Sequence, residues 1–505
     1  MKSPTIAGRA LRFGPWLGIF GAVAVAAIGI GGSVSGQTPE PVADRSALTG
    51  AELFNLPFPG AGNQRSCASC HVAADSFALT ADHAERLWQE NPLDPLFSAI
   101  DADDPAAATL TFDHLRKGLV RVWLTLPENM DQIDAAGNVI TPDDRRIFVW
   151  RSVPSIADAA LTAPYQLDGR VATLAEQAQA AILSHSEGLA VPADELARIA
   201  GFVAQVFTSE RSRAVAALLT GGTPMTDIPE PEAGLVLTVE EQRGREVYEA
   251  VCAACHGGAN LTTIIDREIH DMAFPALGVD GNVIYQVPAT DPPTPVRASQ
   301  PNNEFINIGT AIENFLVQID ATEHESFTGD LSFPQYRFRF YQDATRTVAI
   351  ADLPPAPAFP IDLLFGGDEG GPSGPGGGES GFGGDGLPAF NDENGNPING
   401  PNFFALQLFT TDPGRAAITG NPYDFEAFDI PTLRGIANTA PYWHNNISAT
   451  LEAVIDLYSD HLLVKFPPLV LEGVKQVDRD GDIGPVGEAL TEQQKTDLLA
   501  YLRRL

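Results

Sequence analysis

The residues of this chain best suited to chemistry are its four cysteines, which fall in two clusters, each followed by a histidine. The clusters read Cys67-Ala68-Ser69-Cys70-His71 and Cys252-Ala253-Ala254-Cys255-His256. Two thiols three positions apart can bond the two vinyl groups on one edge of a porphyrin, while the following histidine ligates its iron. For that ligation the imidazole must be neutral, and its second nitrogen normally donates to a fixed acceptor. The spacing therefore predicts two covalently attached c-type haems, with His71 and His256 as the proximal iron ligands.

Two other kinds of site also use cysteine pairs. A zinc site built from all four thiols would need two pairs that are far apart in the sequence to meet. A redox dithiol gives no reason for a histidine to follow both pairs. Haem attachment is the interpretation that uses every residue of both motifs.

Helices are expected around both motifs. Two segments have the capping-box form that starts a helix, Thr238-Val239-Glu240-Glu241 and Thr491-Glu492-Gln493-Gln494. The second leads into leucines at helical spacing, namely Leu498, Leu499, Leu502 and Leu505. Before each motif a glycine is followed four positions later by an aromatic residue, in the pairs Gly50 with Phe54 and Gly244 with Tyr248.

A second repeated segment divides the chain. Residues 154–174 align without gaps with residues 431–451, and each copy contains Thr-Ala-Pro-Tyr and ends in Ala-Thr-Leu. Each half therefore has one cysteine motif followed by the same block. A duplicated haem domain explains this pattern, because each macrocycle needs its own apolar envelope.

The repeat predicts a mainly α fold: two cytochrome c-like haem domains in tandem, with long loops and an insertion in the second. We expect these domains at 45–220 and 237–505, on either side of a segment rich in Gly and Pro. There are 175 positions between His256 and Pro431 but 83 between His71 and Pro154, which places the insertion in the second domain. Its part at 366–386 is dominated by glycine and predicts a flexible surface loop.

The N-terminus has the layout of a secretory signal peptide. Lys2, Arg9 and Arg12 precede an apolar run that ends in small residues, and cleavage is expected near residue 36. An uncleaved anchor is the alternative, because the apolar run approaches the roughly 20 residues that span a bilayer. Both interpretations place the folded part outside the cytoplasm, in the periplasm.

The charge of the chain excludes some partners. The sequence has 31 basic and 65 acidic residues, a formal net charge of −34. This opposes binding to nucleic acid or to an anionic membrane surface. It favours an electron-transfer partner with a basic face.

Several further motifs resemble those of the dihaem bacterial cytochrome c peroxidase and MauG family. In the second half these are Asp412-Pro413-Gly414-Arg415, Thr419-Gly420-Asn421-Pro422, Pro431-Thr432-Leu433-Arg434 and Thr439-Ala440-Pro441-Tyr442-Trp443-His444. In the first half they are Asp168-Gly169-Arg170, Leu174 and Gln177-Ala178. The resemblance implies that the N-terminal haem reacts with hydrogen peroxide and that the C-terminal haem passes electrons to it.

The resemblance also implies residues on the reactive face of the N-terminal haem. They are Gln177 and Glu187, which would orient the peroxide and transfer its proton. His185 could take the acid–base role instead, because its ordinary pKa of about 6.5 suits proton transfer near neutrality. The assignment between His185 and Glu187 is open.

The chain departs from the family pattern at two positions. The tryptophan that lies between the haems in the family is replaced by Leu167, so a relay through that position is in doubt, and Trp123, Trp150 and Trp443 are candidate substitutes. The methionine that often ligates the second iron is replaced by Ala427. The candidate sixth ligands are therefore Tyr423, His444 and His461, while His83 and His114 could cap the first iron.

Calcium and dimerisation are further expectations. The family often binds calcium between domains, and Asp478-Arg479-Asp480-Gly481-Asp482 could hold it, although it lacks the pattern of an EF-hand loop. Family members are often homodimers.

The function expected from the resemblance is reduction of hydrogen peroxide to water. The electrons would come from a small periplasmic donor protein, a cytochrome c or a cupredoxin, and pass from the C-terminal to the N-terminal haem. Two alternatives stay open: a MauG-like enzyme that oxidises a residue on a partner protein, and a non-enzymatic dihaem electron carrier.

Overall fold

The computed structural model describes residues 45–58, 62–253, 255–262, 305–306, 333–353, 409–462 and 489–505, without the side chains of residues 306, 423 and 460–462. The described residues from Ser46 to Leu505 belong to one compact unit. The predicted signal peptide at 1–36, the glycine-rich segment at 366–386 and the acidic segment at 478–482 lie outside the described residues.

Helices dominate the described residues. The α-helices are α1 Gly50–Asn55, α2 Ala81–Glu90, α3 Asp113–Arg116, α4 Leu174–Ser184, α5 Ala193–Val203, α6 Glu210–Thr220, α7 Val239–Val251, α13 Ala416–Thr419, α14 Leu451–Asp456 and α16 Glu492–Leu502. A π-helical turn, η10 Leu457–Leu462, follows α14. The short 3-10 turns are η1 Arg45–Ala47, η2 Cys67–Ser69, η3 Ala73–Asp75, η4 Ala99–Asp101, η5 Ala159–Leu161, η6 Met225–Asp227, η7 Pro231–Gly234, η8 Pro422–Asp424 and η9 Ile436–Asn438.

Both predicted capping boxes are confirmed. Thr238 caps α7 and Thr491 caps α16, each accepting a hydrogen bond from a backbone N–H while the third helical residue bonds back. The same arrangement starts α1 at Thr49 and α4 at Thr173, two boxes that the sequence analysis did not identify. A cap of this kind satisfies N–H groups that have no partner inside the helix.

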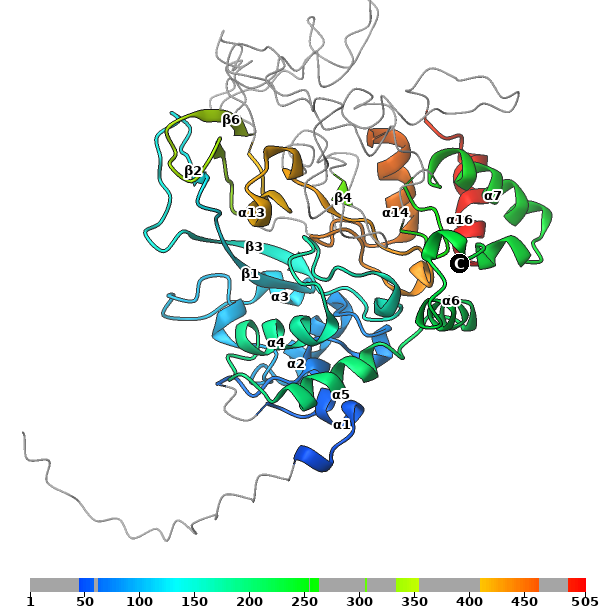
Figure 1. Cartoon of the computed structure of the whole chain (residues 1–505), viewed down its shortest axis with the longest axis horizontal. Coiled ribbons are helices and arrows are strands. Elements are labelled where there is room, and N and C mark those ends of the chain that lie inside the picture. Colours follow the sequence, from blue (N-terminus) through cyan, green and yellow to red (C-terminus); the bar gives the residue numbers. More distant parts are fainter. Residues whose placement is uncertain are drawn as a thin grey trace, which may run out of the picture. The chain divides into compact units, whose positions relative to one another are not determined.

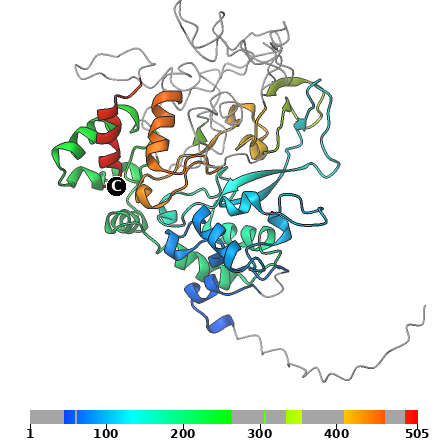
Figure 2. The same cartoon turned by 180° about the vertical axis from the view of Figure 1, so that it is seen from behind.

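Two helix pairs cross at the glycines that precede the cysteine motifs. Helix α1 contacts α5, and α7 contacts α16, as Figures 1 and 2 show. A Cβ atom built on Gly50 would lie 2.0 Å from the carbonyl oxygen of Arg198, and one on Gly244 would lie 1.8 Å from that of Asp497. Only glycine permits these backbone approaches. The same crossing therefore frames both motifs.

The strands form three small antiparallel sheets. Strand β1 Leu119–Thr125 pairs with β3 Arg146–Ser152, from Leu119 opposite Ser152 to Thr125 opposite Arg146. Strands β2 Met130–Gln132, β5 Phe338–Tyr341 and β6 Ala349–Leu353 form the second sheet, and β4 Phe305–Ile306 and β7 Phe428–Asp429 form the third. The fold is thus helix-rich with some sheet, and these strands are absent from the expectation of a mainly α fold.

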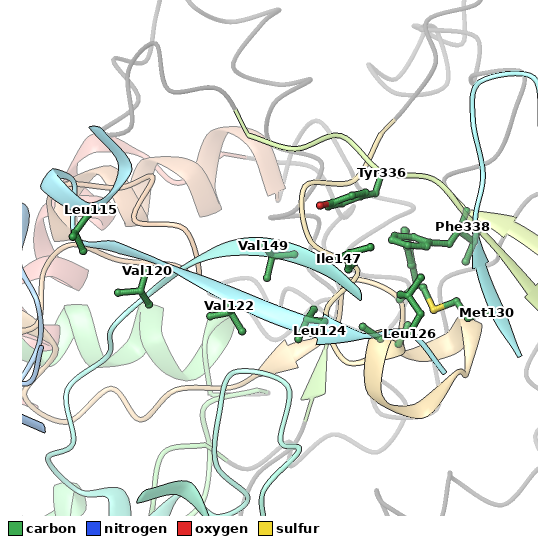
Figure 3. Packing of buried hydrophobic residues seen from close by; sticks show 14 of the residues in the cluster. Leu115, Val120, Val122, Leu124, Leu126, Met130, Ile147, Val149, Tyr336 and Phe338 are labelled. Atoms are coloured by element: carbon green, nitrogen blue, oxygen red, sulfur yellow. The ribbon is translucent and has the colours of Figure 1, made fainter. Parts of the chain in front are cut away.

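The largest apolar core packs around these sheets. The inward side chains of β1 and β3, such as Val122, Leu124 and Val149, meet Met130 and Phe338 in one buried cluster (Figure 3). The core therefore combines residues from both halves of the sequence.

The repeated block adopts one backbone conformation twice. Each residue of the first copy corresponds to the residue 277 positions later. Both copies contain a 3-10 turn (η5 and η9), a cis bond before the equivalent prolines Pro164 and Pro441, and a following helix (α4 and α14). Equivalent backbone bridges join Tyr165 to Val171 and Tyr442 to Ser448. The repeat read from the sequence is thus a structural repeat, while its division into two domains stays a prediction.

Candidate functional site

The two cysteine motifs fold into the same turn. In the first, the N–H groups of Cys70 and His71 donate to the carbonyl of Cys67 at 3.2 and 2.9 Å. In the second, Cys255 and His256 donate to Cys252 at 3.1 and 2.9 Å. None of the four thiols is in a disulfide. The turn brings the paired thiols close together.

The two motif histidines are held in matching ways. The Nδ1 atom of His71 lies 2.9 Å from the carbonyl oxygen of Phe77, and that of His256 lies 3.1 Å from that of Pro431. Burial lowers the pKa of both rings, that of His256 to about 4, while nearby carbonyls, including that of Pro154 beside His71, act in the opposite direction. Both rings are therefore neutral at pH 7, with Nδ1 donating and Nε2 available as a metal ligand.

An apolar envelope surrounds each motif. Cys67 packs against a cluster that contains Phe54, Phe58 and Ile182. Cys252 and Cys255 pack against a second cluster with Tyr248, Leu498 and Tyr501. Burial raises the pKa of the Cys67, Cys70 and Cys252 thiols, so these three are protonated at neutral pH. Thiols outside any disulfide, an oriented neutral imidazole and apolar walls fit a covalently bound haem at each motif.

The residues predicted for the reactive face lie on α4 and just after it. Gln177 is half-buried on this helix, and His185 is the residue that caps its C-terminus. Burial lowers the pKa of His185, and the nearby charges that act on it include Asp101 and Arg65. Within the described part of the chain, its Nδ1 atom has no hydrogen-bond partner. Glu187 is exposed, and its backbone is left-handed with φ 48°.

A buried arginine that the sequence analysis missed supports His185. The side chain of Arg65 is 1% exposed and pairs with Asp101 at 2.5 Å. Its guanidinium also donates to the carbonyl of His185 at 3.1 Å, and the amide of Asn63 donates to the same oxygen at 2.7 Å. These bonds fix the backbone that carries the imidazole. No sequence motif marks Arg65 beyond its place two positions before Cys67.

A second buried charge cluster joins the two halves of the repeat. Arg151 donates to Asp168 at 2.5 Å and to both carboxylate oxygens of Asp412 at 2.7 and 2.9 Å. Arg415 donates to the carbonyl of Asp168 at 2.6 Å. Asp168, Asp412 and Arg415 belong to motifs singled out in the sequence, but their partner Arg151 was missed, because nothing local indicates its role.

Of the three candidate sixth ligands, the structure places the side chain of His444 alone. This ring is buried and stacks on Phe428 with centroids 4.2 Å apart. Among the described residues neither ring nitrogen has a hydrogen-bond partner, and burial lowers its pKa to about 4. The side chains of Tyr423 and His461 lie outside the described residues. Tyr458, which the sequence analysis did not consider, packs against the same apolar cluster as Cys252 and Cys255.

The other candidate residues make contacts of their own. His83 lies 3.5 Å from Asp75, and His114 pairs with Asp103 at 2.6 Å and stacks on Trp150. Trp123 is 39% exposed.

The part of the chain that the structure describes contains no group of three or more His, Cys, Asp or Glu side chains arranged to hold a metal ion. No described helix combines the length and the apolar character needed to cross a bilayer.

Comparison with known proteins gives short sequence matches to cytochrome-c peroxidases. The chain is 45% identical over 49 residues to cytochrome-c peroxidase IdrP2 of Denitromonas iodatirespirans, a match to 10% of this chain and 13% of that protein. It is 38% identical over 69 residues to cytochrome c551 peroxidase of Nitrosomonas europaea, or 12% of this chain and 21% of that one. The matches thus span less than a quarter of either relative. They relate the chain to peroxidases of this kind without selecting a member.

No protein-family model matches the chain. Among solved structures, one described as a MauG-like protein associated with microbial copper homeostasis is 20% identical, covering 90% of this chain and 86% of that one. Its TM-score is 0.36, too low to establish a shared fold.

Proposed function

We propose that this protein is an exported dihaem c-type peroxidase, which reduces hydrogen peroxide to water with electrons from a small periplasmic donor protein. The observation that carries the proposal is the duplicated site. Each Cys-x-x-Cys-His turn lies in an apolar envelope, and each imidazole is fixed by backbone carbonyls. The short matches to cytochrome-c peroxidases support the same conclusion.

The residues that would hold the two haems follow from the motifs. Cys67, Cys70 and His71 would hold the first, and Cys252, Cys255 and His256 the second. When bound, haem c supplies a redox-active iron with a position for a further ligand. Reducing one hydrogen peroxide to two waters takes two electrons and two protons. The protein must therefore supply a proton-transfer group at one haem and a path for electrons from the other.

The structure favours His185 over Glu187 as the proton-transfer group. Within the described residues Nδ1 of His185 is unpaired, and burial holds its pKa low, so the neutral ring can accept a proton. Its backbone is fixed by Arg65 and Asn63. Glu187 has an exposed side chain, although its backbone carbonyl accepts a bond from Gly62. A half-buried Gln177 on the same helix would orient the peroxide.

Electrons would enter at the second haem, bound by His256. The net charge of −34 favours a donor with a basic face, such as a small cytochrome c or a cupredoxin. The steering is electrostatic, so the rate of electron delivery should fall as ionic strength rises.

Ligand access tests the proposal against a pure electron carrier. The experiment is electron paramagnetic resonance of the oxidised and the half-reduced protein, with and without cyanide, after two haems per chain have been confirmed. A peroxidase shows, in at least one of these states, a high-spin ferric signal that cyanide converts to low spin. Low-spin signals that cyanide does not change in either state would refute the peroxidase proposal.

Export and assembly complete the proposal. N-terminal sequencing of the mature protein from a periplasmic fraction should begin near residue 37 if the signal peptide is cleaved. Sedimentation of the purified protein at increasing concentration tests the homodimer.

A further inference from the structure

Two backbone hydrogen bonds join the halves of the repeat in a crossed pattern. The N–H of Ser152 donates to the carbonyl of His444 at 2.6 Å, and the N–H of Asp429 donates to the carbonyl of Leu167 at 2.9 Å. Asp429 lies 277 positions after Ser152, the same offset as in the repeat that begins two residues later, and His444 lies 277 positions after Leu167. Each half therefore gives the other one donor and one acceptor.

Each donor lies two residues before the proline that faces a motif histidine. The carbonyl of Pro431 lies 3.1 Å from Nδ1 of His256. The carbonyl of Pro154 lies beside His71 and raises the pKa of its ring, while Nδ1 of His71 lies 2.9 Å from the carbonyl oxygen of Phe77. His71 is thus linked through residues 152–154 to His444. In the same way His256 is linked through residues 429–431 to Leu167.

The two links differ in the residues that lie beyond each hydrogen bond between the halves. We call the first the His444 arm (Tyr458, Trp443, His444, Ser152, Pro154 and His71) and the second the Leu167 arm (Gln166, Leu167, Asp429, Pro431 and His256). In the His444 arm the rings of Trp443 and Tyr458 are 5.2 Å apart, and both pack against the apolar cluster that also contacts Cys252 and Cys255.

The Leu167 arm has no such rings. The positions equivalent to Trp443 and Tyr458 are Gln166 and Ala181. In the His444 arm the indole of Trp443 is also fixed, because its Nε1–H donates to the hydroxyl of Ser448 at 2.7 Å. The His444 arm alone therefore connects a cysteine motif to the opposite histidine through packed aromatic rings and bonded atoms.

The rate of electron tunnelling falls less steeply with distance along covalent and hydrogen bonds than across through-space gaps. We propose that electrons pass between the two haems through the His444 arm, from Tyr458 and Trp443, across the hydrogen bond from Ser152 to His444, and on to His71. This rests on the proposed function, because it names the route between its two haems. In each transfer one electron would move from a haem held by His256 to a haem held by His71. The donor protein replaces that electron, and hydrogen peroxide finally takes it up.

The test compares two equivalent substitutions, Trp443→Leu and Gln166→Leu. Pulse radiolysis adds one electron to the oxidised protein, and absorbance follows its redistribution between the haems. We expect Trp443→Leu to slow the redistribution at least about tenfold and Gln166→Leu to leave it at the parent rate. Haem content and both reduction potentials, measured first, should be unchanged. A parent rate in Trp443→Leu, or equal slowing by both substitutions, would overturn the route.

A second pair of variants tests the hydrogen bond itself. Ser152→Pro removes the N–H that donates to His444, whereas Ser152→Ala keeps it. The route predicts slow redistribution in the proline variant alone, and equal rates in the two variants would contradict it. The peroxidase proposal fails in a different way: a protein that exchanges electrons between its haems at the normal rate yet consumes no peroxide would refute that activity and leave the route intact.

Discussion

Arg151 and Asp412 are 261 residues apart in the sequence and form a buried bidentate ion pair. Nε of Arg151 lies 2.7 Å from Oδ2 of Asp412, and its Nη2 lies 2.9 Å from Oδ1. The same guanidinium holds Asp168, which belongs to the repeated block of the first half. One arginine therefore neutralises a carboxylate from each half. The crossed backbone hydrogen bonds of Ser152 and Asp429 lie in the strands next to this cluster, so the charge cluster and the proposed electron route share one junction.

Arg151→Met should destabilise the protein strongly. The substitution leaves Asp412 buried without its cation and Asp168 with Arg170 alone, and breaking a buried ion pair in this way costs about 3–5 kcal/mol. The free energy of unfolding in urea at pH 7 measures the effect. Arg503→Met is the matched control, because Arg503 pairs with Glu452 at the surface, where both side chains are at least half exposed. It should change stability by less than about 1 kcal/mol. Equal effects from both would contradict this account.

The protein should lose stability as the pH falls below about 4. Burial alone would raise the pKa of Asp168, but Arg151 and Arg170 hold it below its ordinary value. For Asp103 the hydrogen bonds of His114 and the N–H of Asp113 likewise outweigh burial and lower its pKa. A carboxylate with a lowered folded pKa contributes stability above its unfolded pKa of about 3.9 and loses it as pH falls through the folded value.

Asp103→Asn isolates one part of this dependence. Because the amide does not titrate, the variant should show a shallower loss of unfolding free energy between pH 5 and pH 3 than the parent protein. Urea titrations at several pH values measure the slope. An unchanged slope would mean that Asp103 does not contribute.

Gly244→Ala should loosen the crossing of α7 and α16. The added methyl group would meet the carbonyl of Asp497, a backbone atom that cannot rotate away. Such overpacking costs about 1–3 kcal/mol or more. Gly201→Ala is the matched control, since this glycine is also helical but a Cβ there would have nothing within 4 Å. That change should stabilise the protein by about 0.4–1 kcal/mol, as thermal unfolding of both variants would show.

His185→Gln should abolish most peroxide turnover. Loss of a general acid–base group lowers the rate by about 10²–10⁴-fold, and kcat should fall more than KM rises. Ser184→Ala, at the exposed neighbouring position, should leave turnover unchanged. Steady-state kinetics with a reduced small cytochrome c measures all three proteins. If Glu187→Gln produced the large loss and His185→Gln did not, the acid–base assignment would pass to Glu187.

Local patterns in the sequence predicted the local structure well. The capping boxes at Thr238 and Thr491 start helices, and the gapless repeat fixes one backbone conformation in two places. Capping depends on residues three positions apart, so it can be read directly. The same rule would have found the helices that start after Thr49 and Thr173.

The strands and the buried charges were not predicted. Strands β1 and β3 are rich in Val, Ile, Phe and Trp, a composition that favours strands and could have been recognised. The partners of Arg65 and Arg151 could not be read in this way. They lie 36 and 261 positions away, and only the folded chain brings them together. A charged residue looks solvent-exposed in the sequence until its partner is known.

The measurement that tests the central claim most directly is a titration of the fully reduced protein with hydrogen peroxide, without any donor, after two covalent haems per chain have been confirmed. The account predicts that one equivalent of peroxide is consumed rapidly as both haems lose their electrons, with His185→Gln much slower. Slow oxidation at the same rate in parent and variant, or no consumption of peroxide, would contradict it.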